Sequence, residues 1–171
     1  MTQRISKDEY YLGIAREVAR RSTCFRRSIG AIIVRDDQII STGYAGAPRK
    51  TRDSLEHGSC LRDQLNIPHG QRYELCRSVH AEQNAIINSA RAGVSLLCGD
   101  MYVHGSVPES GEPIDAVPCF ICKKMIINAG LVRIICSTAD RRFAAFTVED
   151  WARAWREGDI LDDTRQYGSG I

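Results

Sequence analysis

The stretch CFICKKMIINAGLVRIIC, at residues 119–136, predicts a helix that is followed directly by a buried strand. Its first eleven residues favour a helix with Gly130 at its end, because glycine readily adopts the left-handed conformation that terminates helices. The remaining LVRIIC is a short and almost continuous apolar run, which is typical of a strand covered on both faces. Together these two elements favour an α/β architecture.

The segments on either side extend this pattern in both directions. Residues 79–92 predict a helix that Gly93 ends, and residues 100–104 predict a short strand. Upstream, the β-rich runs 30–35 and 38–43 flank Asp36-Asp37 and indicate a hairpin, preceded by a helix over 7–22 that Ser6 caps. Thr147 and Asp150 have the spacing of a capping box that opens a further helix. A hairpin followed by helix–strand–helix–strand predicts a three-layer α/β/α sandwich with a central mixed sheet.

Length and composition limit the class of protein. The 171 residues are enough for one domain, with 43% hydrophobic residues, 26% charged residues and a net charge of +2. This balance excludes a largely disordered chain and gives no footprint for long nucleic acid. The absence of a long apolar run or a signal-like N-terminus predicts a cytoplasmic protein with no membrane contact. We expect a single domain over 1–160 and a mobile tail over 161–171.

The seven cysteines are better explained by metal binding or catalysis than by disulfides. Their number is odd and no export signal is recognised, both of which argue against a disulfide framework. Cys98 and Cys136 lie in apolar runs and are predicted to be small buried side chains. The cysteines that cluster are the candidates for chemistry.

Two short segments, His80-Ala81-Glu82 and Pro118-Cys119-Phe120-Ile121-Cys122, carry the candidate metal site. Cysteines at positions i and i+3 of a helix share one face and can reach one ion. One imidazole and two thiolates suit Zn²⁺ and leave its fourth tetrahedral position open, whereas a structural site normally closes that position. The alternatives are a CxxC redox pair, a closed four-ligand zinc site, and a buried histidine that binds no metal.

Glu82 is the candidate proton carrier, since a carboxylate two residues after the ligand can accept a proton from a zinc-bound water and pass it on. An H-x-E segment followed by P-C-x-x-C is the signature of zinc-dependent nucleobase deaminases.

With these segments in place, the chain resembles the cytidine deaminase superfamily, and within it the deoxycytidylate (dCMP) deaminases. STGYAGAP at 41–48, HAEQNAI at 80–86 and CKKMIINAGLVRII at 122–135 are similar to that family, and the resemblance covers about residues 10–137. It implies that His80, Cys119 and Cys122 hold zinc, that Glu82 is the proton shuttle, and that attack occurs at C4 of cytosine. The implied reaction converts dCMP and water to dUMP and ammonia, a source of thymidylate precursor. Members are commonly hexamers, and many respond to dCTP and dTTP.

Two features depart from the family pattern. Gly43-Tyr44-Ala45-Gly46 has alanine where the family usually has asparagine, which puts sugar recognition or effector control in doubt. The segment 105–117 is longer than the expected link, and it is either a lid, a contact with a neighbouring subunit or an ordinary surface insertion.

The resemblance also implies a second, structural zinc in some members. We predict Cys24, Cys60 and Cys76 as its ligands, with His57 as the fourth, because the long irregular segment 44–77 needs a tie that a metal would provide. The alternative is three unrelated thiols. For a substrate or effector phosphate the candidates are Arg26, Arg27 and Arg49, since the guanidinium group matches phosphate oxygens.

The leading hypothesis is therefore hydrolytic deamination of dCMP by a zinc enzyme. A first alternative is a deaminase of another substrate, such as dCTP, cytidine, guanine, a riboflavin precursor or an adenosine in tRNA. A second is a zinc-stabilised module that binds nucleotides without converting them. Ammonia release from a panel of cytosine compounds separates these possibilities.

Overall fold

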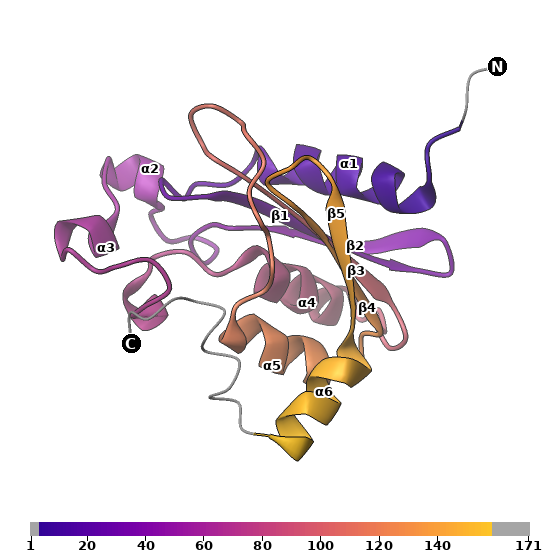
Figure 1. The fold of residues 1–171 in the computed structure, drawn as a ribbon. Coiled ribbons are helices and arrows are strands. Elements are labelled where there is room, and N and C mark those ends of the chain that lie inside the picture. The colour runs from indigo at the N-terminus through magenta and orange to yellow at the C-terminus, as the bar shows by residue number, and fades with distance from the viewer. Residues whose placement is uncertain (1–3, 159–171) are drawn as a thin grey trace.

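The computed structural model describes residues 4–158, and its strands form one five-stranded mixed sheet (Figure 1). The spatial order is β2-β1-β3-β4-β5. Strands β3 and β4 pair in parallel, whereas the other neighbours pair antiparallel. The strands are β1 (Ser28–Arg35), β2 (Gln38–Tyr44), β3 (Asp100–Ser106), β4 (Arg133–Ser137) and β5 (Phe143–Thr147).

Helices cover both faces of this sheet, which confirms the predicted three-layer α/β/α architecture (Figure 1). Helix α1 (Lys7–Ala19) packs on β1 and β3 from one side. Helices α4 (Ala81–Ala92) and α5 (Phe120–Asn128) pack on the other side, and α6 (Val148–Glu157) lies against α5 and β5. Two hydrophobic clusters result, a small one under α1 and a larger one under α4 and α5. No helix within residues 4–158 has the length and apolar character that crossing a bilayer requires.

The hairpin predicted around Asp36-Asp37 is confirmed. Both aspartates have positive φ, 51° and 62°, as in the two-residue turns that match the twist of paired strands. The Asp37 side chain accepts a hydrogen bond of 2.7 Å from the Tyr11 hydroxyl and pairs with Lys7 at 2.7 Å. The turn is thereby fixed to α1.

Two glycines on adjacent strands allow the helices to approach the sheet closely. A Cβ on Gly30 would lie 2.3 Å from Ala19 N, in α1. A Cβ on Gly43 would lie 2.3 Å from both Ala81 O and Ala85 N, in α4. Real Cβ atoms do not approach backbone atoms this closely, so each position accepts only glycine without movement of a helix. Gly43 therefore sets the distance between β2 and the helix that begins after His80.

Three sequence predictions need correction, and one strand was missed. The first helix ends at Ala19 and not at residue 22, and β5 was not predicted. The segment 44–77 is not a plain loop, since it contains α2 (Ser54–His57), α3 (Leu61–Gln64) and the 3₁₀ helix η1 (Tyr73–Leu75). Cys136 is buried as predicted, but Cys98 is exposed and has a φ of 62° in the turn between α4 and β3. An apolar run indicated burial wrongly there, because the chain must turn at that point.

Segment 105–117 is held at its base by the sheet. The Gly105 N–H donates to Ser137 Oγ at 3.0 Å, Ile114 N–H to Gly105 O at 3.0 Å, and Ala116 N–H to Ser137 O at 3.0 Å. These bonds fix the path that leads into α5. The tip of the segment projects beside α1 (Figure 1). The tail predicted over 161–171 lies outside the described residues, as do both ends of the predicted domain 1–160.

Candidate metal centre

The structure brings together the three predicted metal ligands from two helix starts. His80 is the N-cap of α4 and Cys119 is the N-cap of α5. Cys122 follows in the first turn of α5, so both sulfurs lie on the side of that helix that faces His80. The Sγ atoms of Cys119 and Cys122 each lie 3.4 Å from His80 Nδ1.

These three groups fit a zinc ion. Tetrahedral geometry with ordinary Zn–S and Zn–N bond lengths puts sulfur and nitrogen about 3.5 Å apart, close to the distances in this site. All three ligand atoms lie within 4.8 Å of one another, and within residues 4–158 no further histidine, cysteine or carboxylate belongs to the group. The donor set of one imidazole and two thiols is that of an open zinc site.

The thiols and the imidazole interact even without a metal. A hydrogen bond from Cys122, aided by His80, lowers the pKa of Cys119 to about 4. One sulfur of the pair is thus readily available as a thiolate, the form that binds metal.

Glu82 lies in the first turn of α4 and only 5% of its surface is exposed. Burial raises the pKa of its carboxyl group, while the nearby His80 opposes the shift. Burying an unpaired charge is costly, so a carboxyl group at this depth indicates a functional role. Its position beside the three ligands, but outside their group, suits a proton carrier and not a fourth ligand.

Polar contacts with β2 hold α4 in place. Ser41 Oγ donates to Ala85 O at 2.5 Å, Asn88 Nδ2 to Thr42 O at 2.7 Å, and Asn84 Nδ2 to Tyr44 O at 2.8 Å. Just before the helix, paired backbone hydrogen bonds join residues 46 and 79. His80 and Glu82 therefore start a helix that is attached to the sheet along its length.

The three arginines predicted for a phosphate are placed differently. Arg26 donates to Asp63 Oδ1 at 2.7 Å and to Ile67 O at 2.7 Å, which ties the start of β1 to the α3 region. Arg49 donates to Asn88 Oδ1 at 2.6 Å on the surface. Arg27 is exposed, and although burial raises the pKa of the Tyr73 phenol, the charge of Arg27 lies close enough to oppose that rise.

The residues predicted for a second zinc come partly together. Cys24, Cys60 and Cys76 are all free and half-buried. Burial raises the pKa of Cys24, and the nearby Cys76 and Cys60 add to this shift, so the three thiols share one region. They do not form a group within 4.8 Å in the described chain, and His57 is exposed at the last position of α2.

Sequence reasoning missed two residues beside the metal centre. The Tyr73 ring meets His80 edge-on, with centroids 4.8 Å apart and planes at 84°. The guanidinium of Arg62 lies 4.9 Å from the centre of the same Tyr73 ring, and Arg62 is only 5% exposed. Both lie in the irregular segment 44–77, where no periodic pattern marks buried positions.

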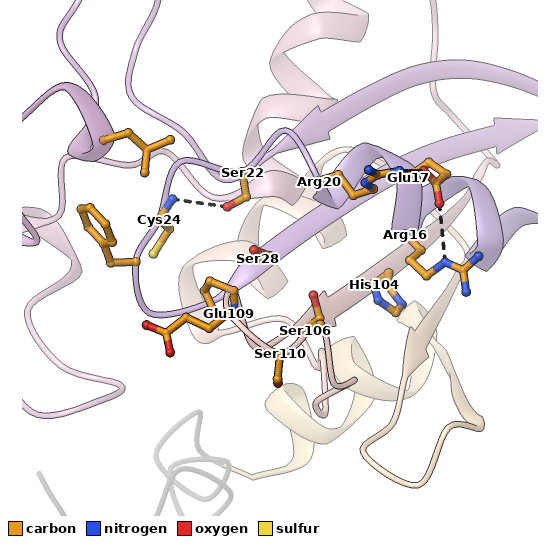
Figure 2. Close-up of a pocket in the computed structure, with 14 residues that line it drawn as sticks. Arg16, Glu17, Arg20, Ser22, Cys24, Ser28, His104, Ser106, Glu109 and Ser110 are labelled. Carbon is orange, nitrogen blue, oxygen red and sulfur yellow. Dashed lines mark hydrogen bonds and ion pairs between the residues drawn. The ribbon is translucent and has the colours of Figure 1, made fainter. Parts of the chain in front are cut away.

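Two surface hollows of about 800 and 840 Å³ lie away from this centre. Figure 2 shows the first, with Arg16 from α1, Arg20 just after that helix, His104 from β3 and the tip of segment 105–117 around it. His104 shares a strand face with Tyr102, which packs in the cluster under α1, whereas Val103 packs on the opposite side. The hollows are therefore on the α1 side, and the metal centre is on the other.

Comparison with known proteins agrees with this geometry. Residues 5–138 match the family model described as the cytidine and deoxycytidylate deaminase zinc-binding region. The deoxycytidylate deaminase of Schizosaccharomyces pombe is 30% identical over 140 residues, which are 80% of this chain and 38% of that protein. The deoxycytidylate deaminase of Mycobacterium phage D29 is 32% identical over 133 residues, or 75% of this chain and 91% of that protein. The chain spans about two fifths of the length of its yeast relatives.

Solved structures show the same fold. The dCMP deaminase of cyanophage S-TIM5 matches with a TM-score of 0.56 at 23% identity, covering 80% of this chain and 86% of that one. The cytidine deaminase of Burkholderia pseudomallei matches with a TM-score of 0.57 at 14% identity, covering 85% and 95%. The family match and the His80, Cys119 and Cys122 cluster lead to one conclusion: this chain belongs to the cytidine and deoxycytidylate deaminase family, with the zinc-binding region that defines it.

Proposed function

We propose that the protein catalyses the hydrolytic deamination of dCMP, giving dUMP and ammonia. The observation that carries this proposal is the open three-ligand centre of His80, Cys119 and Cys122 with buried Glu82 beside it. Several relatives are named deoxycytidylate deaminase, which supports dCMP as the substrate that we propose over other cytosine compounds. A structure of the cyanophage relative is described as a complex with dCMP and dUMP.

Each residue has a defined task in this reaction. His80, Cys119 and Cys122 hold the zinc ion, which when bound lowers the pKa of a coordinated water and so supplies a nucleophile at neutral pH. Glu82 takes one proton from the attacking water and delivers it to N3 of cytosine, and it then takes the remaining proton from the new C4 hydroxyl and delivers it to the departing amine. The water oxygen forms a bond to C4, the C4–N bond breaks, and ammonia leaves. Because Glu82 is buried next to the ligands, its proton is not lost to bulk solvent.

Arg27 is our candidate for the 5′-phosphate among the three predicted arginines. It is exposed and its charge reaches Tyr73, which contacts His80. Arg26 is occupied by Asp63 and a carbonyl group, and Arg49 by Asn88. Arg27→Ala should raise the KM for dCMP and leave the turnover of deoxycytidine unchanged, with Arg49→Ala as the matched surface control. An equal loss with both substrates would contradict the assignment.

The substrate is tested by ammonia release from dCMP, dCTP, CMP, cytidine and deoxycytidine. The proposal expects the highest kcat/KM with dCMP. A higher value with another compound would replace dCMP as the substrate and keep the reaction. Tight nucleotide binding without ammonia from any compound would favour a binding module.

We also propose a second, structural zinc at Cys24, Cys60 and Cys76. Supporting this, Cys60 and Cys76 lie near Cys24 and add to the rise in its pKa that burial causes, and backbone N–H groups of Arg26 and Arg27 donate to the Cys24 sulfur. Metal binding would draw the thiols closer, with His57 as our candidate for the fourth ligand. Elemental analysis should find two zinc ions per chain, and one per chain in Cys60→Ser. A value of one in the wild type would remove the site.

Three further properties are proposed, the hexamer and the effector response from the family resemblance and the location from the sequence pattern. The protein is expected to be a cytoplasmic hexamer whose dCMP dependence shifts with dCTP and dTTP. Sedimentation velocity tests the hexamer, and kinetics with each triphosphate test the control. Ala45 is buried here, with its N–H bonded to Ile29 O, and Ala45→Asn tests whether asparagine at this position changes the response.

A further inference from the structure

The orientation of the His80 ring needs a physical cause. A metal-bound histidine is usually oriented by a hydrogen bond from its second ring nitrogen to a carboxylate or carbonyl group. Among residues 4–158, the ring's contacts with the two thiols both go through Nδ1, and no hydrogen bond from Nε2 accompanies them. The aromatic group against the His80 ring is Tyr73, at 4.8 Å and almost perpendicular. An edge-to-face contact of this kind restricts rotation of both rings.

Tyr73 is itself held from the other side. The guanidinium of Arg62 lies 4.9 Å from the centre of the Tyr73 ring, within the range of a cation–π contact. Arg62 is 5% exposed and pairs with no carboxylate in the described chain. Its NH2 group donates to Pro68 O at 2.9 Å, and its Nε is buried without a partner. A buried guanidinium with so few polar partners owes much of its stabilisation to the aromatic ring.

We propose that Arg62 and Tyr73 form a brace that positions His80 as a zinc ligand. In this brace the guanidinium packs on the Tyr73 ring, and the Tyr73 ring sets the orientation of the imidazole. Arg62 and Tyr73 are positioning residues, because neither belongs to the metal-ligand group. The brace gives the irregular segment between β2 and α4 a role in metal retention. The inference rests on the proposed use of His80 as a zinc ligand.

The test is the rate at which the protein releases zinc to a chelator, measured well below the unfolding temperature. The phase of zinc release that is lost in Cys119→Ser is assigned to the His80 centre. If the wild type shows no such phase, the assignment of His80, Cys119 and Cys122 as zinc ligands is refuted, and not the brace alone. Loss of groups that support a metal ligand typically weakens metal binding about 10- to 100-fold, so we expect this phase to be about 10-fold faster in Tyr73→Ala. Tyr73→Phe keeps the ring and should release zinc at the wild-type rate.

Matched variants separate the brace from a general loss of stability. Gln64→Ala, in the same short helix as Arg62 but exposed and uncharged, should leave the release rate unchanged. Arg62→Met should accelerate zinc release. Combining it with Tyr73→Ala should accelerate release little further, because both changes break the same brace. The visible spectrum of the Co²⁺-substituted protein should shift in Tyr73→Ala and stay unchanged in Tyr73→Phe. A folded Tyr73→Ala protein with wild-type release and spectrum would overturn the proposal, as would fully additive effects of the two changes.

Discussion

Replacing Gly43 with alanine should disturb the candidate metal centre, because the substitution in β2 would displace α4, the helix that begins after His80. The added Cβ would lie 2.3 Å from Ala81 O and 2.3 Å from Ala85 N, whereas ordinary contacts begin near 3.4 Å. The start of α4 must therefore move away from β2 by about 1 Å. The hydrogen bonds from Ser41 and Asn88 that attach the helix to the strand would stretch at the same time.

The size of the effect follows from that displacement. Forcing extra volume into a packed contact costs about 1–3 kcal/mol of unfolding free energy. Because His80 and Glu82 lie at the start of the displaced helix, kcat/KM for dCMP should fall about 100-fold, the typical loss for a misplacement near 1 Å. Denaturant unfolding measures the first quantity, and initial rates of ammonia release measure the second.

Two other glycines serve as controls. Gly30→Ala would meet Ala19 N at 2.3 Å in α1, on the opposite face, so it should destabilise the fold with a smaller loss of activity per folded molecule. Gly13→Ala in α1 meets nothing within 4 Å and should stabilise by about 0.5–1 kcal/mol. Unchanged stability and activity in Gly43→Ala would refute the reasoning. Equal activity losses in the Gly30 and Gly43 variants would refute the part that assigns the loss to α4.

Three more perturbations have defined outcomes. Glu82→Gln should retain zinc and lose at least about 100-fold in kcat, since a proton carrier contributes about 10²–10⁴-fold; near-normal turnover would exclude this role. Removing zinc with a chelator should abolish ammonia release and adding Zn²⁺ should restore it, whereas activity that persists in zinc-free protein would contradict a metal mechanism. Arg26 holds the pKa of Asp63 in the folded protein below its value in the unfolded chain. The pair therefore stabilises the fold fully at pH values above the unfolded-state pKa of Asp63, and this contribution disappears as the pH falls through the lower folded-state pKa. Asp63→Asn should thus cost up to about 1 kcal/mol at neutral pH, with the difference from wild type vanishing in strong acid; a constant difference at all pH values would be contrary to this origin.

Elements with their own periodic pattern could be predicted from the sequence. The hairpin around Asp36-Asp37 and the helices that begin near residues 7, 81, 120 and 148 carry local signals, namely turn residues, caps and apolar spacing. Strand β5 carries none, because its FAAFT sequence is short and its pairing depends on β4 beside it. Helices α2 and α3 have four residues each, too few for a helical period to be visible.

The clustering of the candidate metal ligands could be predicted because zinc binding depends on residue types at fixed local spacing. His80 and Glu82 are two residues apart, and Cys119 and Cys122 are three apart, so each segment shows its role separately. The brace of Arg62 and Tyr73 beside His80 has no such spacing in the sequence and results from tertiary packing. The partners of Arg26 and Arg49 depend on tertiary contacts in the same way, which is why sequence could not separate them from Arg27.

The most direct measurement is a crystal structure with anomalous diffraction at the zinc edge. We predict an ion bonded to His80 Nδ1 and to the sulfurs of Cys119 and Cys122, with water or a nucleotide analogue, and no protein side chain, as the fourth ligand. A fourth side chain on that ion, or no ion between these residues, would contradict the proposed deaminase mechanism.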